Sequence, residues 1–169
     1  MVQGKYVIFV IFGTALAMAL FAWQFRINEG DDVLDYWGVE SANLLRHANN
    51  VEFIKLASAD AVAADSTLAI EGIQQNIVSV VDISSRKGLI HARHMFIVDH
   101  TYLWEESPPL NIPSWDFALR FSGGNKEVTL VFHKQSHAVQ MLDNNQPLIM
   151  GPMFENLLYY LTPLLAPQE

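Results

Sequence analysis

The sequence predicts an α+β protein in which one N-terminal transmembrane helix precedes a single small domain. Three features of its 169 residues support this prediction. An uncharged apolar stretch stands near the N-terminus, paired runs of alternating hydrophobicity are joined by short turns, and segments with helical spacing flank those pairs. We therefore expect a mainly antiparallel sheet of about five or six strands, covered by about three helices.

The membrane-spanning segment is predicted from Tyr6 to Trp23, where 18 consecutive residues carry no charge. A helix of this length is roughly 27 Å long, close to the thickness of the hydrocarbon layer of a bilayer. Tyr6 and Trp23 stand at its two ends, where amphipathic aromatic side chains favour the headgroup layer. Residues 1–27 are thus expected to form a membrane anchor, and residues 28–169 to form the α+β domain.

A cleaved signal peptide is the alternative, because residues 17–19 have the small-x-small pattern of a cleavage site. The apolar stretch continues past that pattern to Trp23, which favours an uncleaved signal anchor. Lys5 and the amino terminus precede the span, and Arg26 alone follows it closely. This charge bias predicts a cytoplasmic N-terminus and an extracytoplasmic domain, periplasmic in a bacterium, anchored in the inner (plasma) membrane.

The first half of the domain is predicted to contain a helix and about three strands. Asp31 and Asp32 can cap the helix, and Gly38 interrupts its apolar pattern, so its firm part is expected from about Val39 to residues 49–50. Runs that favour β-structure predict strands at 51–56, 67–70 and 77–83. Between these strands, a loop is expected at 57–66 and a turn at 71–76.

A β-hairpin is the clearest local pattern in the second half of the domain. Residues 117–121 and 127–133 alternate, and a Gly-rich loop of about five residues joins them. The apolar residues of both strands should face the same core: Phe117, Leu119, Phe121, Val128, Leu130 and Phe132. A third strand is expected at 138–142, before a turn rich in Asn.

Two helices and a proline-rich loop complete the predicted domain. Helical spacing covers residues 87–98, and the loop from Trp104 to Trp115 follows, stiffened by three prolines. Pro152 stands in the first turn of a closing helix, which is expected over 153–161 and stopped by Pro163.

Composition excludes several classes of protein. The chain is 51% hydrophobic and 17% charged, which excludes a disordered chain. A net charge of −8, with no Lys/Arg cluster in the sequence, excludes a general nucleic-acid binder. The absence of cysteine excludes disulfides, thiolate zinc sites, CxxC haem attachment and a Cys nucleophile. No nucleophile elbow, HExxH motif or phosphate-binding glycine motif occurs, so no catalytic residue is predicted.

Candidate interaction residues lie in the span, in the proline-rich loop and in the last helix. They are Gly13, Ala17, Trp104, Pro108, Pro109, Trp115, Tyr159 and Tyr160. Small residues four apart let another helix approach closely, and a loop of aromatic residues and prolines offers contact area at low entropic cost. The last helix is apolar on more than one face. The alternative for the loop is that both tryptophans fold back and roof the hydrophobic core.

Histidines suggest a second interpretation, a metal or haem site. His91 and His94 would share a helix face, and His100 lies six residues further on. Neutral imidazole binds zinc, copper, nickel and haem iron, but a zinc site needs three or four ligands. The simpler interpretation is that these histidines lie on the solvated surface, and in that case no cofactor is predicted.

These features together predict a single-pass membrane protein that acts by protein–protein interaction, as an accessory or assembly subunit of a larger membrane complex. Its expected partners are the membrane and another membrane protein, and not nucleic acid. The alternative is a periplasmic metal- or haem-binding protein that uses His91, His94 and His100. A third interpretation, an enzyme with a shallow site, has no motif to support it.

Overall fold

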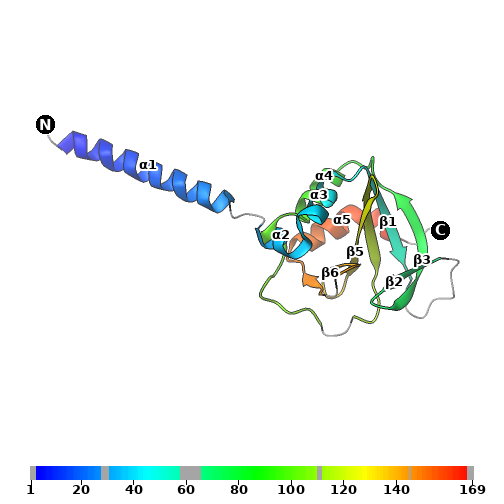
Figure 1. Cartoon of the computed structure of the whole chain (residues 1–169). Coiled ribbons are helices and arrows are strands. Elements are labelled where there is room, and N and C mark those ends of the chain that lie inside the picture. The colour runs from blue at the N-terminus through cyan, green and yellow to red at the C-terminus, as the bar shows by residue number, and fades with distance from the viewer. Residues whose placement is uncertain (1–2, 28–30, 58–65, 110–111, 145, 167–169) are drawn as a thin grey trace.

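One antiparallel sheet, with helices on one side, forms the domain (Figure 1). The computed structural model describes residues 3–27, 31–57, 66–109, 112–144 and 146–166. The helices are α1 (Gln3–Ile27), α2 (Asp31–Trp37), α3 (Val39–His47), α4 (Leu89–Met95), the 3-10 helix η1 (Asp99–Thr101) and α5 (Met153–Leu165). The strands are β1 (Asn50–Leu56), β2 (Thr67–Ile70), β3 (Ile73–Asp82), β4 (Phe117–Gly123), β5 (Lys126–His133), β6 (Ala138–Met141) and β7 (Leu148–Ile149).

The strand order is β2-β3-β1-β4-β5-β6-β7, and every neighbouring pair is antiparallel. The predicted α+β class, with an antiparallel sheet behind an N-terminal apolar helix, is therefore confirmed. The sheet has seven strands rather than five or six, because β7 adds Leu148–Ile149 beside β6. Two residues are too few to show alternation, so the sequence pattern could not predict this strand.

The first predicted helix is divided by Gly38, so the described part of the domain has four α-helices, α2 to α5, rather than three. Gly38 has φ 78° and ψ 148°. A residue with a Cβ rarely adopts this conformation, so a glycine is needed where the chain turns from α2 into α3. The turn brings Trp37 of α2 and Leu45 of α3 into the same core.

Replacing Gly38 by alanine tests the importance of this turn. Apart from Gly38 and its two chain neighbours, no described residue has an atom within 4 Å of the added Cβ, so the cost arises from the backbone conformation. We expect Gly38→Ala to lower the free energy of unfolding by about 1–3 kcal/mol. Urea unfolding of the full-length chain in neutral detergent measures the change. Gly4→Ala in α1, which also has open space at its Cβ, should leave the midpoint unchanged, and an unchanged midpoint for Gly38→Ala would contradict the backbone argument.

Two hairpin turns are shorter than the sequence predicts. The turn between β2 and β3 is Glu71–Gly72, with φ of 51° and 81°, as a two-residue type I′ turn requires. The turn predicted at 71–76 is wrong in length, because its polar residues extend β3 and pair with β2. The loop between β4 and β5 is likewise reduced to residues 124–125. Of the loop predicted at 57–66, residues 58–65 lie outside the described residues.

The main core lies between the sheet and α2 to α5 (Figure 1). The predicted common face of the central hairpin is confirmed, because its side chains form three cross-strand pairs: Phe117–Phe132, Leu119–Leu130 and Phe121–Val128. Phe117 and Phe132 stack with ring centroids 4.8 Å apart. Helical side chains from α4 and α5, among them Leu89 and Leu157, complete this core.

The opposite face of the sheet carries a second, smaller core. Ile54, Ala118, Val131 and Ala138 are fully buried there. The proline-rich loop covers them with Trp115, which is 5% exposed. The central strands are thus buried on both faces without a second layer of helices among the described residues, whereas β3 keeps exposed side chains such as Val78.

The two later helices differ in length from the predictions. α4 ends at Met95, because Phe96 and Ile97 bond back three residues rather than four and tighten the chain into a 3-10 turn. The prediction that Pro163 stops the last helix is wrong, since α5 continues through it to Leu165. Pro163 cannot donate to the carbonyl of Tyr159, but Tyr159 is 84% exposed, so water can take the place of that bond.

Helix α1 contains the stretch Tyr6–Trp23, which is long and apolar enough to cross a membrane. None of this stretch is buried against the rest of the described chain (Figure 1). Large apolar side chains such as Phe9 and Phe21 therefore point outward on all sides. The predicted apolar helix is confirmed as a helix.

Candidate functional site

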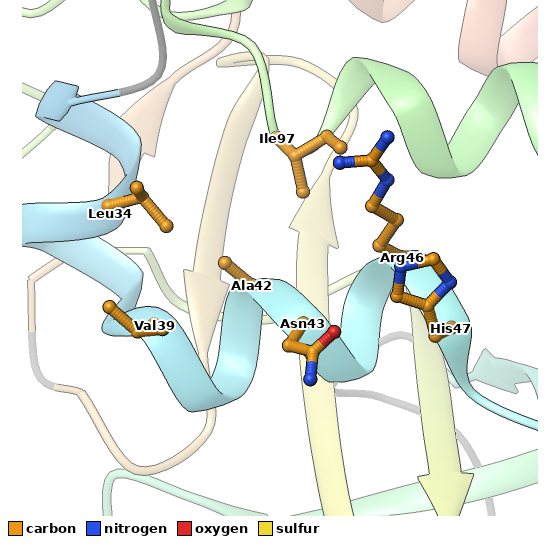
Figure 2. A pocket seen from close by; sticks show the side chains of 7 residues that line it. All are labelled: Leu34, Val39, Ala42, Asn43, Arg46, His47 and Ile97. Carbon is orange, nitrogen blue, oxygen red and sulfur yellow. The ribbon is translucent and has the colours of Figure 1, made fainter.

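A shallow groove of about 330 Å³ lies between α2, α3 and the segment that follows α4 (Figure 2). Seven residues line it: Leu34, Val39, Ala42, Asn43, Arg46, His47 and Ile97. Figure 2 shows Leu34 and Val39 at one end and Arg46 and His47 at the other. We term this surface the α2–α3 groove. One end is therefore apolar and the other is polar.

The start of α2 is fixed by a hydrogen bond from a distant segment. The backbone N–H of Val33 donates to Oδ1 of Asp99 in η1, at 2.9 Å. Val33 is fully buried, and Ala42 of α3 also faces inward. Their neighbours Leu34 and Val39 remain 39% and 71% exposed. Rigid helices thus hold two apolar side chains at the surface, where they can bind a partner.

The polar end of the groove is positively charged. Arg46 and His47 occupy the last turn of α3, where a positive charge is favoured by the helix dipole. Arg93 of α4 donates to the carbonyl of Arg46 at 3.3 Å, which brings a second guanidinium close to this end. Among the described residues that line the groove, none is acidic. The groove therefore suits an apolar segment that carries a carboxylate at one end.

Both tryptophans of the proline-rich loop fold back onto the domain. Trp104 is half-buried, and its Nε1 donates to the carbonyl of Asp99 at 2.9 Å. Its ring lies 6.0 Å from that of Tyr36 and 5.3 Å from that of Tyr102. Trp115 is buried in the second core. This placement corresponds to the alternative in which the tryptophans roof the hydrophobic core.

Pro108 and Pro109 line a separate recess of about 310 Å³ beside Trp115. Its polar wall is formed by Glu71 and Gln140, and the Gln140 amide donates to Glu71 at 2.9 Å. These two polar groups satisfy each other.

The two tyrosines of α5 have different surroundings. Tyr159 is exposed, whereas the ring of Tyr160 packs beside Gly88 and lies under the guanidinium of Arg86, 5.1 Å from the ring centroid. Burial raises the pKa of Tyr160, although the positive charges of Arg86 and Arg93 oppose this. The Tyr160 hydroxyl is buried and has no hydrogen-bond partner among the described residues.

Gly13 and Ala17 lie one turn apart on α1, as predicted, and so share one side of this helix. No described atom lies within 4 Å of a Cβ built at Gly13. This side of α1 is therefore open to close approach by another helix.

Among the described residues, the histidines do not form a set of metal ligands. His91 and His94 are exposed and lie one turn apart on α4, while His100 lies in η1. Within the described ranges, no three side chains of His, Asp or Glu are arranged to hold a metal ion. The metal or haem site therefore stays a prediction.

Sequence reasoning missed the α2–α3 groove and the arginines beside it. It noted the helical spacing of Leu34 and the interruption at Gly38, but it did not expect Leu34 and Val39 to line a common groove on the two sides of that turn. The break at Gly38 was predicted, but the angle between the two helices, which opens the groove, depends on tertiary packing. Arg46 and Arg93 meet through tertiary packing alone, and no local pattern relates them.

Comparison of the chain with family models, curated proteins and solved structures finds no match. No relative's activity bears on this chain, so its function is inferred from the exposed helix, the groove and the short segment between them.

Proposed function

We propose that this chain is a single-span membrane protein that binds another membrane protein, as an accessory or assembly subunit of a larger complex. In this proposal α1 crosses the inner (plasma) membrane with its N-terminus in the cytoplasm, and the domain is extracytoplasmic. The observation that carries the proposal is the closeness of two exposed apolar surfaces. The unburied stretch Tyr6–Trp23 is followed, after a short segment, by the α2–α3 groove.

The length of the intervening chain keeps the groove near the membrane. Ile27 ends α1 and Asp31 begins α2, so the two positions lie no more than roughly 14 Å apart. Leu34 lies three residues further along α2, which adds roughly 4.5 Å. A molecule that reaches Leu34 is therefore close to the bilayer surface, as the juxtamembrane part of another membrane protein is.

The chemistry of the groove indicates what the partner presents to it. Leu34 and Val39 offer apolar contacts at one end, and Arg46 offers a positive charge at the other, where Figure 2 also shows Ile97. A juxtamembrane segment with apolar side chains and one carboxylate would match both ends. Gly13 and Ala17 supply a second contact, at which a transmembrane helix of the same partner can approach α1.

Val39→Glu tests the proposal without threatening the fold. Val39 is exposed and begins α3, where a negative charge is favourable to the helix, but the new carboxylate would sit in the apolar end of the groove. We expect the amount of partner isolated with the full-length chain in mild detergent to fall at least about tenfold, which corresponds to about 1.4 kcal/mol. Quantitative mass spectrometry of both proteins measures it.

Val78→Glu is the matched control, because Val78 is an exposed valine on β3, away from the groove. The same membrane protein should be isolated together with the Val78→Glu chain, in the amount found with the wild type. Equal losses in both variants, a Val39→Glu protein that retains its partner, or a wild-type chain isolated alone would each contradict the proposed interaction.

A further inference from the structure

Three arginines surround a second pocket, which lies between the end of α3, the start of α4 and the segment after β3. The pocket has a volume of about 460 Å³, and Arg46, Arg86 and Arg93 line it. We term it the arginine pocket. These are three of only ten Lys and Arg residues in a chain of net charge −8. The pocket is therefore lined by positive charge although the protein as a whole is negatively charged.

The described residues that line the pocket carry no negative charge opposite its arginines. Among the described residues, none of the three guanidinium groups forms a salt bridge, and none of the lining residues is acidic. Asp82 lies nearby, 2.5 Å from the hydroxyl of the lining residue Ser84, but does not itself line the pocket. Three positively charged side chains that line one pocket repel one another, and an anion bound in the pocket would relieve this repulsion.

Backbone contacts hold two of the guanidinium groups in place. Arg93 donates to the carbonyl of Ala48 at 2.8 Å and to that of Arg46 at 3.3 Å, which fixes it against the end of α3. Arg86 donates to the carbonyl of Tyr160 at 3.2 Å and lies over that ring. A guanidinium has five N–H donors, so both groups retain donors for a ligand while their positions are already fixed.

Buried donors without partners give a second, independent indication. Nε of Arg93 and the hydroxyl of Tyr160 are both buried and have no hydrogen-bond partner among the described residues. Burial also lowers the pKa of Arg93, because the charged form loses solvation. Each unsatisfied donor costs about 1–3 kcal/mol. Tyr160 does not line the pocket, but Arg93 does, and a small movement of its side chain towards an anion in the pocket would give its Nε an acceptor.

We propose that the arginine pocket binds a phosphate group. Guanidinium forks match the geometry of phosphate oxygens, and the dianion can accept hydrogen bonds from all three arginines at once. Ser85, which also lines the pocket, offers one further hydroxyl donor. The phosphate group belongs either to a soluble ligand or to a phosphomonoester lipid headgroup, which the short segment after α1 would keep within reach.

Phosphate binding is tested on the full-length chain in neutral detergent, with inorganic phosphate as the probe. We expect phosphate to raise the thermal unfolding midpoint above that in chloride of equal ionic strength. Arg46→Gln and Arg86→Gln should each raise the dissociation constant for phosphate about tenfold or more, since hydrogen bonds to charged groups are lost. Arg93 is left unchanged because it holds the end of α3.

Lys87→Gln is the matched control, since it removes one positive charge next to Arg86 from an exposed residue that does not line the pocket. It should bind phosphate as the wild type does. Arg46→Gln keeps the test decisive if Arg86→Gln disturbs Tyr160, because the Arg46 side chain is exposed. Arg86 does not line the α2–α3 groove, so a loss of phosphate binding and a loss of partner binding can be told apart.

Nanodiscs distinguish the two sources of phosphate. If phosphatidic acid in phosphatidylcholine nanodiscs raises the midpoint of the wild type but not of Arg86→Gln, the ligand is a lipid headgroup. If inorganic phosphate raises the midpoint of the wild type but not of Arg86→Gln in nanodiscs of phosphatidylcholine alone, the ligand is soluble. Both results support the site. The proposal is overturned if neither probe acts beyond chloride, or if both arginine variants respond as the wild type does.

Discussion

Phe132→Ala is expected to lower the free energy of unfolding of the domain by about 3–5 kcal/mol. Phe132 is fully buried, and its ring stacks on Phe117 and contacts Phe96 and Phe154, with centroids 4.8, 5.8 and 6.5 Å away. It therefore connects two strands to the end of α4 and to α5. The loss would be a large part of a typical stability of about 5–15 kcal/mol.

Urea unfolding of the full-length chain in neutral detergent, followed by tryptophan fluorescence, measures this change. Phe9→Ala is the matched control, because Phe9 is 75% exposed on α1 and touches no part of the main core. It should leave the unfolding of the domain unchanged. A loss below about 1 kcal/mol for Phe132→Ala would contradict a tightly packed core at this position.

Gln75→Ala should be the most damaging polar substitution, at about 2–4 kcal/mol. Gln75 is buried on β3, and its amide donates to the carbonyls of Ala57 and Trp115 at 3.0 and 2.5 Å. Its carbonyl oxygen accepts from the N–H of Trp115 at 3.1 Å. Removing this amide leaves three buried backbone groups unpaired and releases the loop that roofs the second core.

Gln74→Ala is the control for this variant, because Gln74 is exposed on the same strand and its side chain bonds only to Thr67 among the described residues. It should change the free energy of unfolding by less than about 0.5 kcal/mol. In Gln75→Ala, the fluorescence of Trp115 should also shift towards that of exposed tryptophan. Equal stabilities of the two variants would show that Gln75 does not hold the loop.

Local sequence patterns were sufficient to predict the elements in which the order of apolar and polar residues marks the side that faces the core. Alternation placed the β4–β5 hairpin and its core face correctly, and the apolar stretch of α1 and the break at Gly38 were also predicted. The errors lie where tertiary contacts decide. Gln75 looks like a turn residue until the backbone groups that it satisfies are known, and Pro163 is tolerated because one side of α5 faces solvent.

The proposed binding surfaces could be predicted from the sequence only in part. Gly13 and Ala17 could be proposed from the sequence because a helix relates residues four apart. The arginine pocket was not found, because Arg46, Arg86 and Arg93 come from segments that only the fold brings together. Trp115 was placed among the candidates for recognition because its residue type is common at interfaces, but burial depends on the whole domain.

The most direct test of partner binding is photo-crosslinking in the native membrane, with a photoreactive amino acid in place of Val39 or Val78. We predict that the probe at Val39 crosslinks in high yield to one integral membrane protein, at a segment next to its transmembrane helix, and that Leu34→Glu suppresses this product. The probe at Val78, which is 58% exposed, should give no such product. Crosslinks from Val39 to lipid alone, or equal products from both positions, would contradict the proposal that the α2–α3 groove binds a membrane protein.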